Sequence, residues 1–153
     1  MAHRDLRAEP SQRRTALSQI EPARTTVGRF HDELRDIFKR EMVFRGATHT
    51  GEEDNLHHEY CEQLYWCALL LYLVGDPADV ALMWEAKHID MDTGCGFDAQ
   101  FLVGAGVEET IRYLRARGMD EIAAYLEKCK AAKDFDDLPG WEQLRIKYFY
   151  SDR

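Results

Sequence analysis

The chain has 153 residues, which is enough for one domain with a buried core. Its net charge of −8 argues against nucleic acid or an anionic membrane as a direct partner, because both are polyanions. The charge is uneven, since residues 1–45 hold ten Lys and Arg against seven Asp and Glu, whereas residues 46–153 hold ten against twenty-one. The acidic body therefore favours a basic partner.

The N-terminal segment is polar and rich in arginine, and it has no apolar stretch of the secretory type. Pro10 and Ser11 interrupt any early helix there, so we predict a flexible N-terminal arm over residues 1–20. The cysteines show no zinc-site spacing, and we expect free thiols in the reducing cytoplasm. They are Cys61, Cys67, Cys95 and Cys129.

Hydrophobic periodicity predicts two long helices before residue 75. In the first, from about Pro22 to Gly46, apolar residues recur at three- and four-residue steps with charges between them. The second, roughly residues 52–74, is apolar on all faces over Leu64–Val74. A membrane span needs about 20 such residues, so this stretch is too short and we expect a buried central helix. A helix at a subunit interface is the alternative.

The triplet Gly75, Asp76 and Pro77 marks the clearest boundary in the chain. Gly75 fits the left-handed position just past a helix end, while Asp76 can cap a new helix that Pro77 begins. That helix runs to about Lys87. Further helices are predicted over residues 97–103, 107–117, 120–133 and 141–148, and no stretch alternates with period two for long enough to indicate a strand.

Residues 21–153 are therefore predicted to form a single all-α domain of about six to seven helices. Residues 80–87 resemble residues 122–128, and their spacing is in the range of HEAT-like repeats of paired helices. Two imperfect copies do not distinguish stacked helix hairpins of this kind from an irregular helical bundle, so both architectures stay open.

The densest cluster of chemically capable side chains lies in the stretch Trp84–Leu114. Its members fall within eleven consecutive positions, and they are His88, Asp90, Asp92, Cys95 and Asp98. Glycines stand among and after them, at positions 94, 96, 104 and 106. Such a segment is either a site or a tight crossing of helices, in which glycines let two backbones approach closely.

The acidic part of this stretch does not fit a metal loop. Asp90 and Asp92 stand two apart before Gly94, a spacing similar to that of calcium loops. Cys95 and Phe101, however, stand where such a loop needs Gly and Glu. A catalytic cysteine needs positive surroundings, and Cys95 has aspartates around it instead. We therefore predict no metal, no cofactor and no catalytic residue.

The central stretch, and above all its block CGFDAQFLVGAGVEETIRYL, resembles small acidic helical proteins of bacteria. Proteins of this size, acidity and helical-repeat character are frequent among immunity proteins, which neutralise a cognate toxin by binding it. The resemblance implies a non-catalytic bacterial protein whose partner is a toxin.

Our leading hypothesis is a protein-binding module, an immunity or inhibitor protein whose acidic surface docks a basic, toxin-like partner. The predicted partner-binding residues are Trp84, His88, Asp90, Asp92, Phe97 and Asp98. The first alternative is a small enzyme or ligand-binding protein, with its site at His88, Asp92, Cys95 and Asp98. The second alternative is a structural or oligomerising module.

Overall fold

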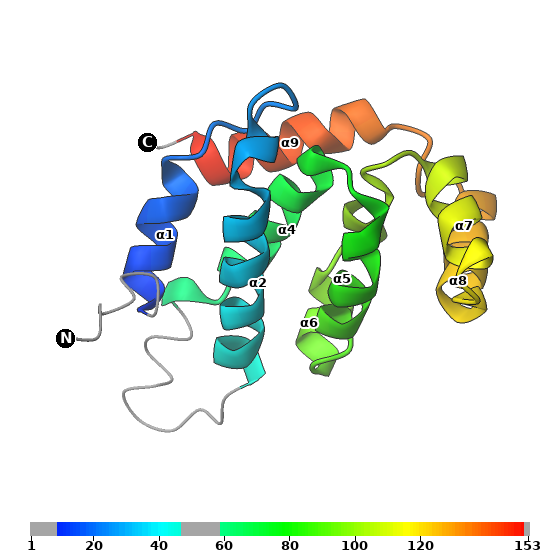
Figure 1. Ribbon diagram of the computed structural model, residues 1–153, viewed down its shortest axis with the longest axis horizontal. Coiled ribbons are helices and arrows are strands. Elements are labelled where there is room, and N and C mark those ends of the chain that lie inside the picture. The colour runs from blue at the N-terminus through cyan, green and yellow to red at the C-terminus, as the bar shows by residue number, and fades with distance from the viewer. Residues whose placement is uncertain (1–8, 47–58, 152–153) are drawn as a thin grey trace.

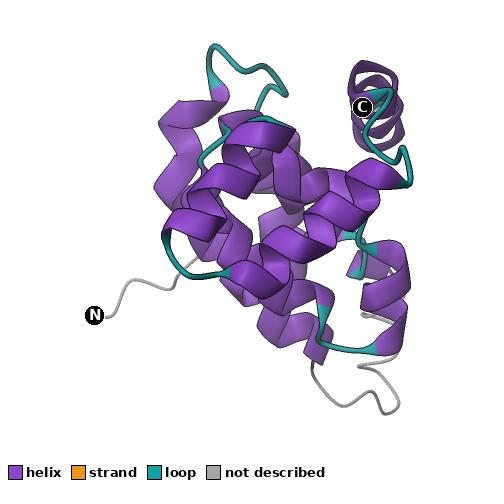
Figure 2. Cartoon of the chain, turned by 90° about the vertical axis from the view of Figure 1, so that its right-hand side faces the viewer, coloured by secondary structure: helices purple, strands orange, loops and turns teal. Residues whose placement is uncertain are grey.

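The computed structural model describes residues 9–46 and 59–151 of the chain. This part of the chain contains eight α-helices, three short 3-10 helices and no strand (Figure 2), which confirms the all-α class and comes close to the predicted helix number. In chain order the elements are α1 (Pro10–Ser18), η1 (Val27–Phe30), α2 (His31–Gly46), α4 (Gln63–Val74), η2 (Pro77–Asp79), α5 (Val80–Lys87), α6 (Met91–Gly96), η3 (Ala99–Val103), α7 (Val107–Ala116), α8 (Asp120–Ala131) and α9 (Leu138–Tyr150).

The helices form an irregular bundle around α4. Figure 1 shows α1, α2 and α5 side by side along the molecule, with α9 passing along one edge and the α7–α8 pair at the far end. The side chains of Leu64, Leu69 and Leu70 are fully buried, and Trp66 stacks on Phe149 of α9 with ring centroids 5.6 Å apart. The prediction of a buried central helix is confirmed. Its alternative, a subunit interface along this helix, is wrong because the chain itself covers the helix.

The start of the predicted helix over residues 52–74 falls partly on residues 52–58, which lie outside the described residues. In the part that the structure describes, Glu59 and Tyr60 are helical, Cys61 and Glu62 form a turn, and α4 begins at Gln63. None of the described helices is long and apolar enough to cross a bilayer.

The prediction of a flexible arm over residues 1–20 is wrong for residues 9–20, while residues 1–8 lie outside the described residues. Pro10 does not break a helix but begins α1, because the first position of a helix tolerates a missing N–H. Leu17 and Ile20 are buried in the core. The hydroxyl of Tyr150, in α9, lies 2.8 Å from the carbonyl oxygen of Ile20 and 3.2 Å from that of Leu17, so the last helix holds the first one in place.

The boundary after α4 is the one that the sequence predicts. Gly75 has a φ of 76°, the left-handed conformation that ends a helix with little strain only for glycine. The Asp76 carboxylate accepts a hydrogen bond from the Ala78 N–H, and Pro77 occupies the first position after this cap. The new element starts as the 3-10 helix η2 and continues as α5, which ends at Lys87 as predicted.

The α7–α8 pair is a helix hairpin closed by a short turn. Ile111 and Leu114 of α7 are buried, as are Ala123 and Leu126 of α8, so the two helices bury apolar faces that the sequence spacing predicts. Gly118, with a φ of 73°, allows the chain to reverse between them.

Glycines in the central stretch do allow backbones to approach. A Cβ atom on Gly104 would lie 2.1 Å from the carbonyl oxygen of Tyr72, at the point where η3 crosses the end of α4. A Cβ atom on Gly96 would lie 2.5 Å from the hydroxyl oxygen of Tyr65. The tight crossing expected from the sequence is therefore present at Gly104, where only a residue without a side chain fits.

Candidate functional site

Residues 91–96, for which the sequence predicts no helix, form the short helix α6. Asp90 caps the short helix α6, because its Oδ1 atom accepts hydrogen bonds from the backbone N–H of Thr93 at 2.7 Å and from the Thr93 hydroxyl at 2.8 Å. Met91, in the first turn, has 84% of its side-chain surface exposed, and Asp92 beside it is also exposed. We call Asp90, Met91 and Asp92 the acidic tip.

Two of the six predicted partner-binding residues are engaged within the chain, Phe97 in the core and the partly exposed Asp98 in contacts with α9. Phe97 is 1% exposed and packs edge-on against Phe101 at 5.2 Å, so it belongs to the core and cannot anchor a partner. Asp98 accepts hydrogen bonds from Trp141 Nε1 and from Arg145 Nε, both at 2.9 Å. Its charge is therefore neutralised by α9, and its role is to tie the start of η3 to the last helix.

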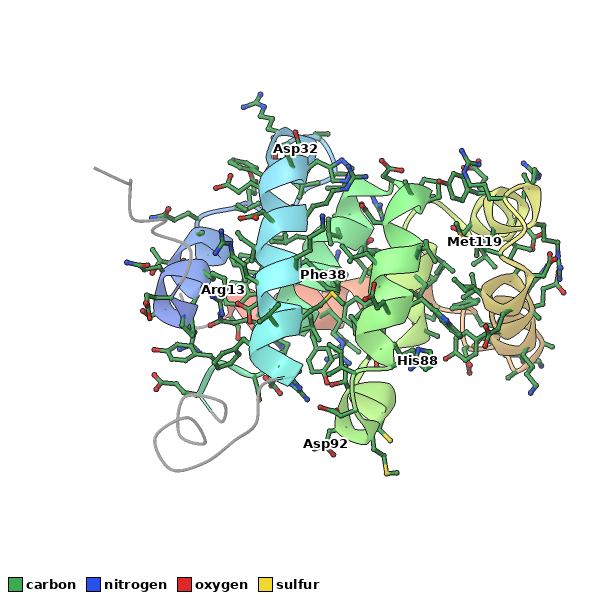
Figure 3. All side chains as sticks on the ribbon, turned by 60° about the horizontal axis from the view of Figure 1, so that its bottom comes forward. Arg13, Asp32, Phe38, His88, Asp92 and Met119 are labelled. Atoms are coloured by element: carbon green, nitrogen blue, oxygen red, sulfur yellow. The ribbon has the colours of Figure 1, made fainter. Side chains whose placement is uncertain are left out.

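Of the other four predicted residues, Trp84 and His88 belong to α5 and its C-cap, and Asp90 and Asp92 belong to the N-cap and first turn of α6. Figure 3 shows His88 and Asp92 on these two neighbouring helices. Trp84 and His88 are one turn apart on α5, with ring centroids 4.5 Å apart, and His88 Nδ1 lies 2.7 Å from the Trp84 carbonyl oxygen. His88 lies at the edge of α5 that faces the α7–α8 hairpin (Figure 3), and the acidic tip follows directly along the chain.

A groove opens between α5 and α8 beside these residues. It has a volume of about 470 Å³ and is lined by Trp84, His88, Glu121, Ala124, Tyr125 and Lys128. Trp84 and Tyr125 meet across it edge to face, with centroids 5.1 Å apart and an interplanar angle of 62°. Both rings are only partly covered, so their apolar faces are available to a partner. We call this feature the α5–α8 groove.

Sequence reasoning missed the α8 side of this groove. Tyr125 stands on the apolar face of a predicted helix, where it could be read only as a core residue. The similarity between residues 80–87 and 122–128 is the sequence signal that links the two helices, because these segments correspond to α5 and α8. No local pattern shows that Trp84 and Tyr125 meet.

Lys87 links the end of α5 to α6 and lies next to an aromatic residue of the α5–α8 groove. Lys87 Nζ donates hydrogen bonds to the carbonyl oxygens of Gly94 at 2.7 Å and Phe97 at 2.8 Å, and it lies 5.9 Å from the centre of the Tyr125 ring. Burial lowers the pKa of Lys87. Burial and a hydrogen bond with Cys129 raise the pKa of Tyr125 to about 12, so this hydroxyl stays protonated at neutral pH.

Replacing this lysine with an apolar residue should destabilise the end of α6. We expect Lys87→Met to lower the free energy of unfolding by about 1–2 kcal/mol at neutral pH, because two carbonyl oxygens lose a charged donor. The pKa of Lys87 is lower in the folded state than its ordinary value of 10.5, so the folded chain loses this proton first as pH rises. The stability of the wild type should therefore increase relative to the variant as pH rises towards 10.5.

Urea unfolding between neutral and alkaline pH measures both effects. Lys128→Met is the matched control, because Lys128 is an exposed lysine on the rim of the same groove. Equal pH dependence in the two variants would show that Lys87 does not titrate below its ordinary range.

One group of side chains has the composition of a metal site. The ligand atoms of His31, Asp76 and Asp79 lie within 4.8 Å of one another. Each of these side chains already has a polar partner: Arg35 Nε donates to Asp79 at 2.6 Å, Arg35 Nη2 donates to Asp76 at 3.2 Å, and His31 Nε2 lies 2.7 Å from Asp79. Since a cation there would also meet the Arg35 guanidinium, the arrangement is better suited to linking α2 to η2 than to holding a metal.

The four residues of the predicted enzyme site are not assembled into a catalytic set. Among the described residues, no hydrogen bond or ion pair joins His88, Asp92, Cys95 and Asp98 to one another. His88 contacts the backbone of its own helix and Asp98 contacts α9, so neither is placed as base or orienting acid for the exposed Cys95 thiol.

No protein family, no curated protein and no solved structure matches this chain. The features that stand out in the described part of this chain are the aromatic α5–α8 groove and the acidic tip that follows α5.

Proposed function

We propose that this chain is a non-catalytic protein-binding module that docks a basic protein on the α5–α8 groove and the acidic tip. One observation carries the proposal: the partly exposed aromatic pair of Trp84 and Tyr125 lines an open groove that also holds the exposed carboxylate of Glu121, and the exposed Asp92 follows α5 along the chain. Aromatic rings in a pocket supply most of the affinity of typical protein interfaces, and charges around them speed association.

The charges around the groove support a basic partner. Asp92 and Glu121 are exposed, and Lys128 is the cation on the groove rim. Lys87 is committed to two backbone carbonyls, so it offers little charge to a partner. The surplus of acidic residues over basic ones after residue 45 extends this field over most of the chain. The resemblance to immunity proteins supports a basic toxin as the partner, with this chain as its inhibitor.

Affinity capture from an extract of the cells that make the protein tests this proposal. The immobilised wild type should retain a basic protein at low salt, and Trp84→Ala should weaken its binding by roughly thirtyfold, the effect of removing an interfacial hot spot. Leu144→Ala is the matched control, because Leu144 is 70% exposed on α9, outside the groove. Equal retention by Trp84→Ala and the wild type would contradict the proposal.

The acidic residues should act mainly on the rate of association with the purified partner. We expect the double reversal Asp92→Lys and Glu121→Lys to lower the association rate constant roughly tenfold at low salt and to flatten its salt dependence. Asp90 is kept, because reversing it would remove the cap of α6. Asp32→Lys is the control, since Figure 3 shows Asp32 at the opposite edge of the molecule from Asp92.

A further inference from the structure

A second groove, between α1 and α2, exposes apolar surface that the α5–α8 groove does not explain. It has a volume of about 450 Å³ and is lined by Pro10, Arg13, Asp36, Lys39, Arg40, Val43 and Phe44. Val43 is 78% exposed and Phe44 is partly covered, and these two side chains supply apolar surface to the lining. We call this feature the α1–α2 groove.

The α1–α2 groove has a positive rim. Arg40 pairs with Asp36 at 3.1 Å on the same helix, and Arg13 pairs with the buried Glu41 at 2.5 Å. Lys39 is exposed and forms no ion pair with any residue that the structure describes. The rim therefore offers one available cation beside an apolar floor, within a protein whose net charge is negative.

The acidic tip has the complementary chemistry. Met91 is 84% exposed, so its flexible apolar side chain projects into solvent. Asp92 next to it is exposed and, over residues 9–46 and 59–151, has no ion-pair partner. An unbranched apolar side chain beside a free carboxylate matches an apolar groove beside a free ammonium group.

The C-terminal end of α2 lies close to the residue that precedes the acidic tip. A Cβ atom on Gly46, the last residue of α2, would lie 3.8 Å from Cγ2 of Ile89, which immediately precedes the acidic tip. Figure 3 shows both Arg13, between α1 and α2, and Asp92, on α6, from one side. A two-fold dimer in which the tip of each copy enters the groove of the other repeats the same contact twice.

We propose that the α1–α2 groove binds the acidic tip of a second copy of this chain, reciprocally, in a two-fold dimer. Met91 of each copy packs on Val43 and Phe44 of the other, and Asp92 of each copy pairs with Lys39 of the other. The dimer covers the acidic tip, so self-association and the docking of a basic partner compete for Asp92.

The charges of the other grooves make them poorer seats for this tip. The groove beside Trp66 and Tyr148 carries Glu59 and Glu62 against Arg14, so it would repel Asp92. The α5–α8 groove has one acidic and one basic residue on its rim, Glu121 and Lys128. The groove between Gly75 and α7 is also balanced, with Glu109 and Arg112. Of these four grooves, the α1–α2 groove alone combines an excess of cations with exposed aliphatic surface.

Sedimentation equilibrium of the full chain, at concentrations up to about 1 mM, tests the dimer. The wild type should associate to a dimer and no further, because a two-fold interface is closed. Asp92→Lys and Lys39→Asp should each weaken the dimer about tenfold or more, and the double variant should restore it, since the pair is rebuilt with its charges exchanged. Met91→Ala should also weaken it. Leu144→Lys, on exposed α9 surface, should leave it unchanged.

A wild type that stays monomeric over the whole range would overturn the proposal, as would two single reversals that the double variant fails to rescue. Circular dichroism of each variant separates lost association from lost folding. A wild type that stays monomeric, while Trp84→Ala still weakens the capture of a basic partner, would overturn the dimer and leave the proposed function standing. The two tests are separate because Trp84 lies in the α5–α8 groove and outside the α1–α2 groove.

Discussion

Gly104→Ala should lower the free energy of unfolding by about 3 kcal/mol or more, which would leave little stability for a domain of this size. The added methyl group would lie 2.1 Å from the carbonyl oxygen of Tyr72 and 2.8 Å from its Cα atom. Those are backbone atoms of the central helix, so no side chain can turn away to make room. The φ of Gly104 is −60°, so alanine accepts the conformation itself and the effect comes from the contact alone.

Chemical unfolding of Gly104→Ala and Gly28→Ala in parallel measures this effect. A Cβ atom on Gly28 would meet no atom within 4 Å, so this control should be neutral or stabilising by roughly 0.5 kcal/mol through the unfolded chain. Similar stabilities for the two variants would mean that η3 can move away from α4, which the tight crossing described above does not allow.

Glu41→Ala should also be severely destabilising, by about 3–5 kcal/mol, because it leaves a buried arginine without its carboxylate. Glu41 is 1% exposed and Arg13 is 3% exposed, and Glu41 also accepts a hydrogen bond from Gln63 at 2.9 Å. Burial raises the pKa of Glu41 even though the charge of Arg13 lowers it. An unpaired charge in these surroundings is therefore strongly unfavourable.

The double variant Arg13→Met, Glu41→Leu separates a lost charge pair from lost packing. We expect it to be much more stable than Glu41→Ala, since neither charge of this buried pair remains. Asp36→Ala, which breaks the exposed pair with Arg40 on the same helix, should change stability by less than about 1 kcal/mol. Thermal unfolding followed by circular dichroism is sufficient, and a double variant as unstable as Glu41→Ala would contradict the explanation by charge.

The elements that the sequence predicts well are those specified by neighbouring residues. The fully apolar stretch Leu64–Val74 can only be buried, and Gly75, Asp76 and Pro77 each have a local backbone role that the structure shows. Local signals of this kind predict most helix ends and the all-α class, because neither depends on which helices pack against each other.

The N-terminal helix shows why the remainder could not be predicted. α1 carries only a weak apolar face, and its stability comes from residues far along the chain: Glu41 pairs with Arg13, Gln63 donates to the Pro10 carbonyl, and Tyr150 reaches the carbonyls of Leu17 and Ile20. No spacing rule links positions that are 28 to 133 residues apart.

The sequence likewise predicts some residues of the candidate site and misses others. Trp84, His88 and the acidic tip stand out by composition, and the structure places them on α5, its C-cap and the start of α6. Asp98 looks equivalent to them in sequence but is neutralised by Arg145, and Tyr125 looks like a core residue but forms the opposite wall of the groove. These assignments depend on the positions of α8 and α9, which only tertiary packing determines.

The hold of α9 on α1 has a consequence for synthesis on the ribosome. Trp66, in the central helix, meets Phe149 and Tyr150 near the C-terminal end of the described chain. A growing chain therefore exposes that side of α4 until its last helix has emerged, and the N-terminal helix has no final docking place before then. We expect the domain to complete its fold only once α9 has left the ribosome, with nascent chains depending on chaperones to keep the apolar central helix from aggregating.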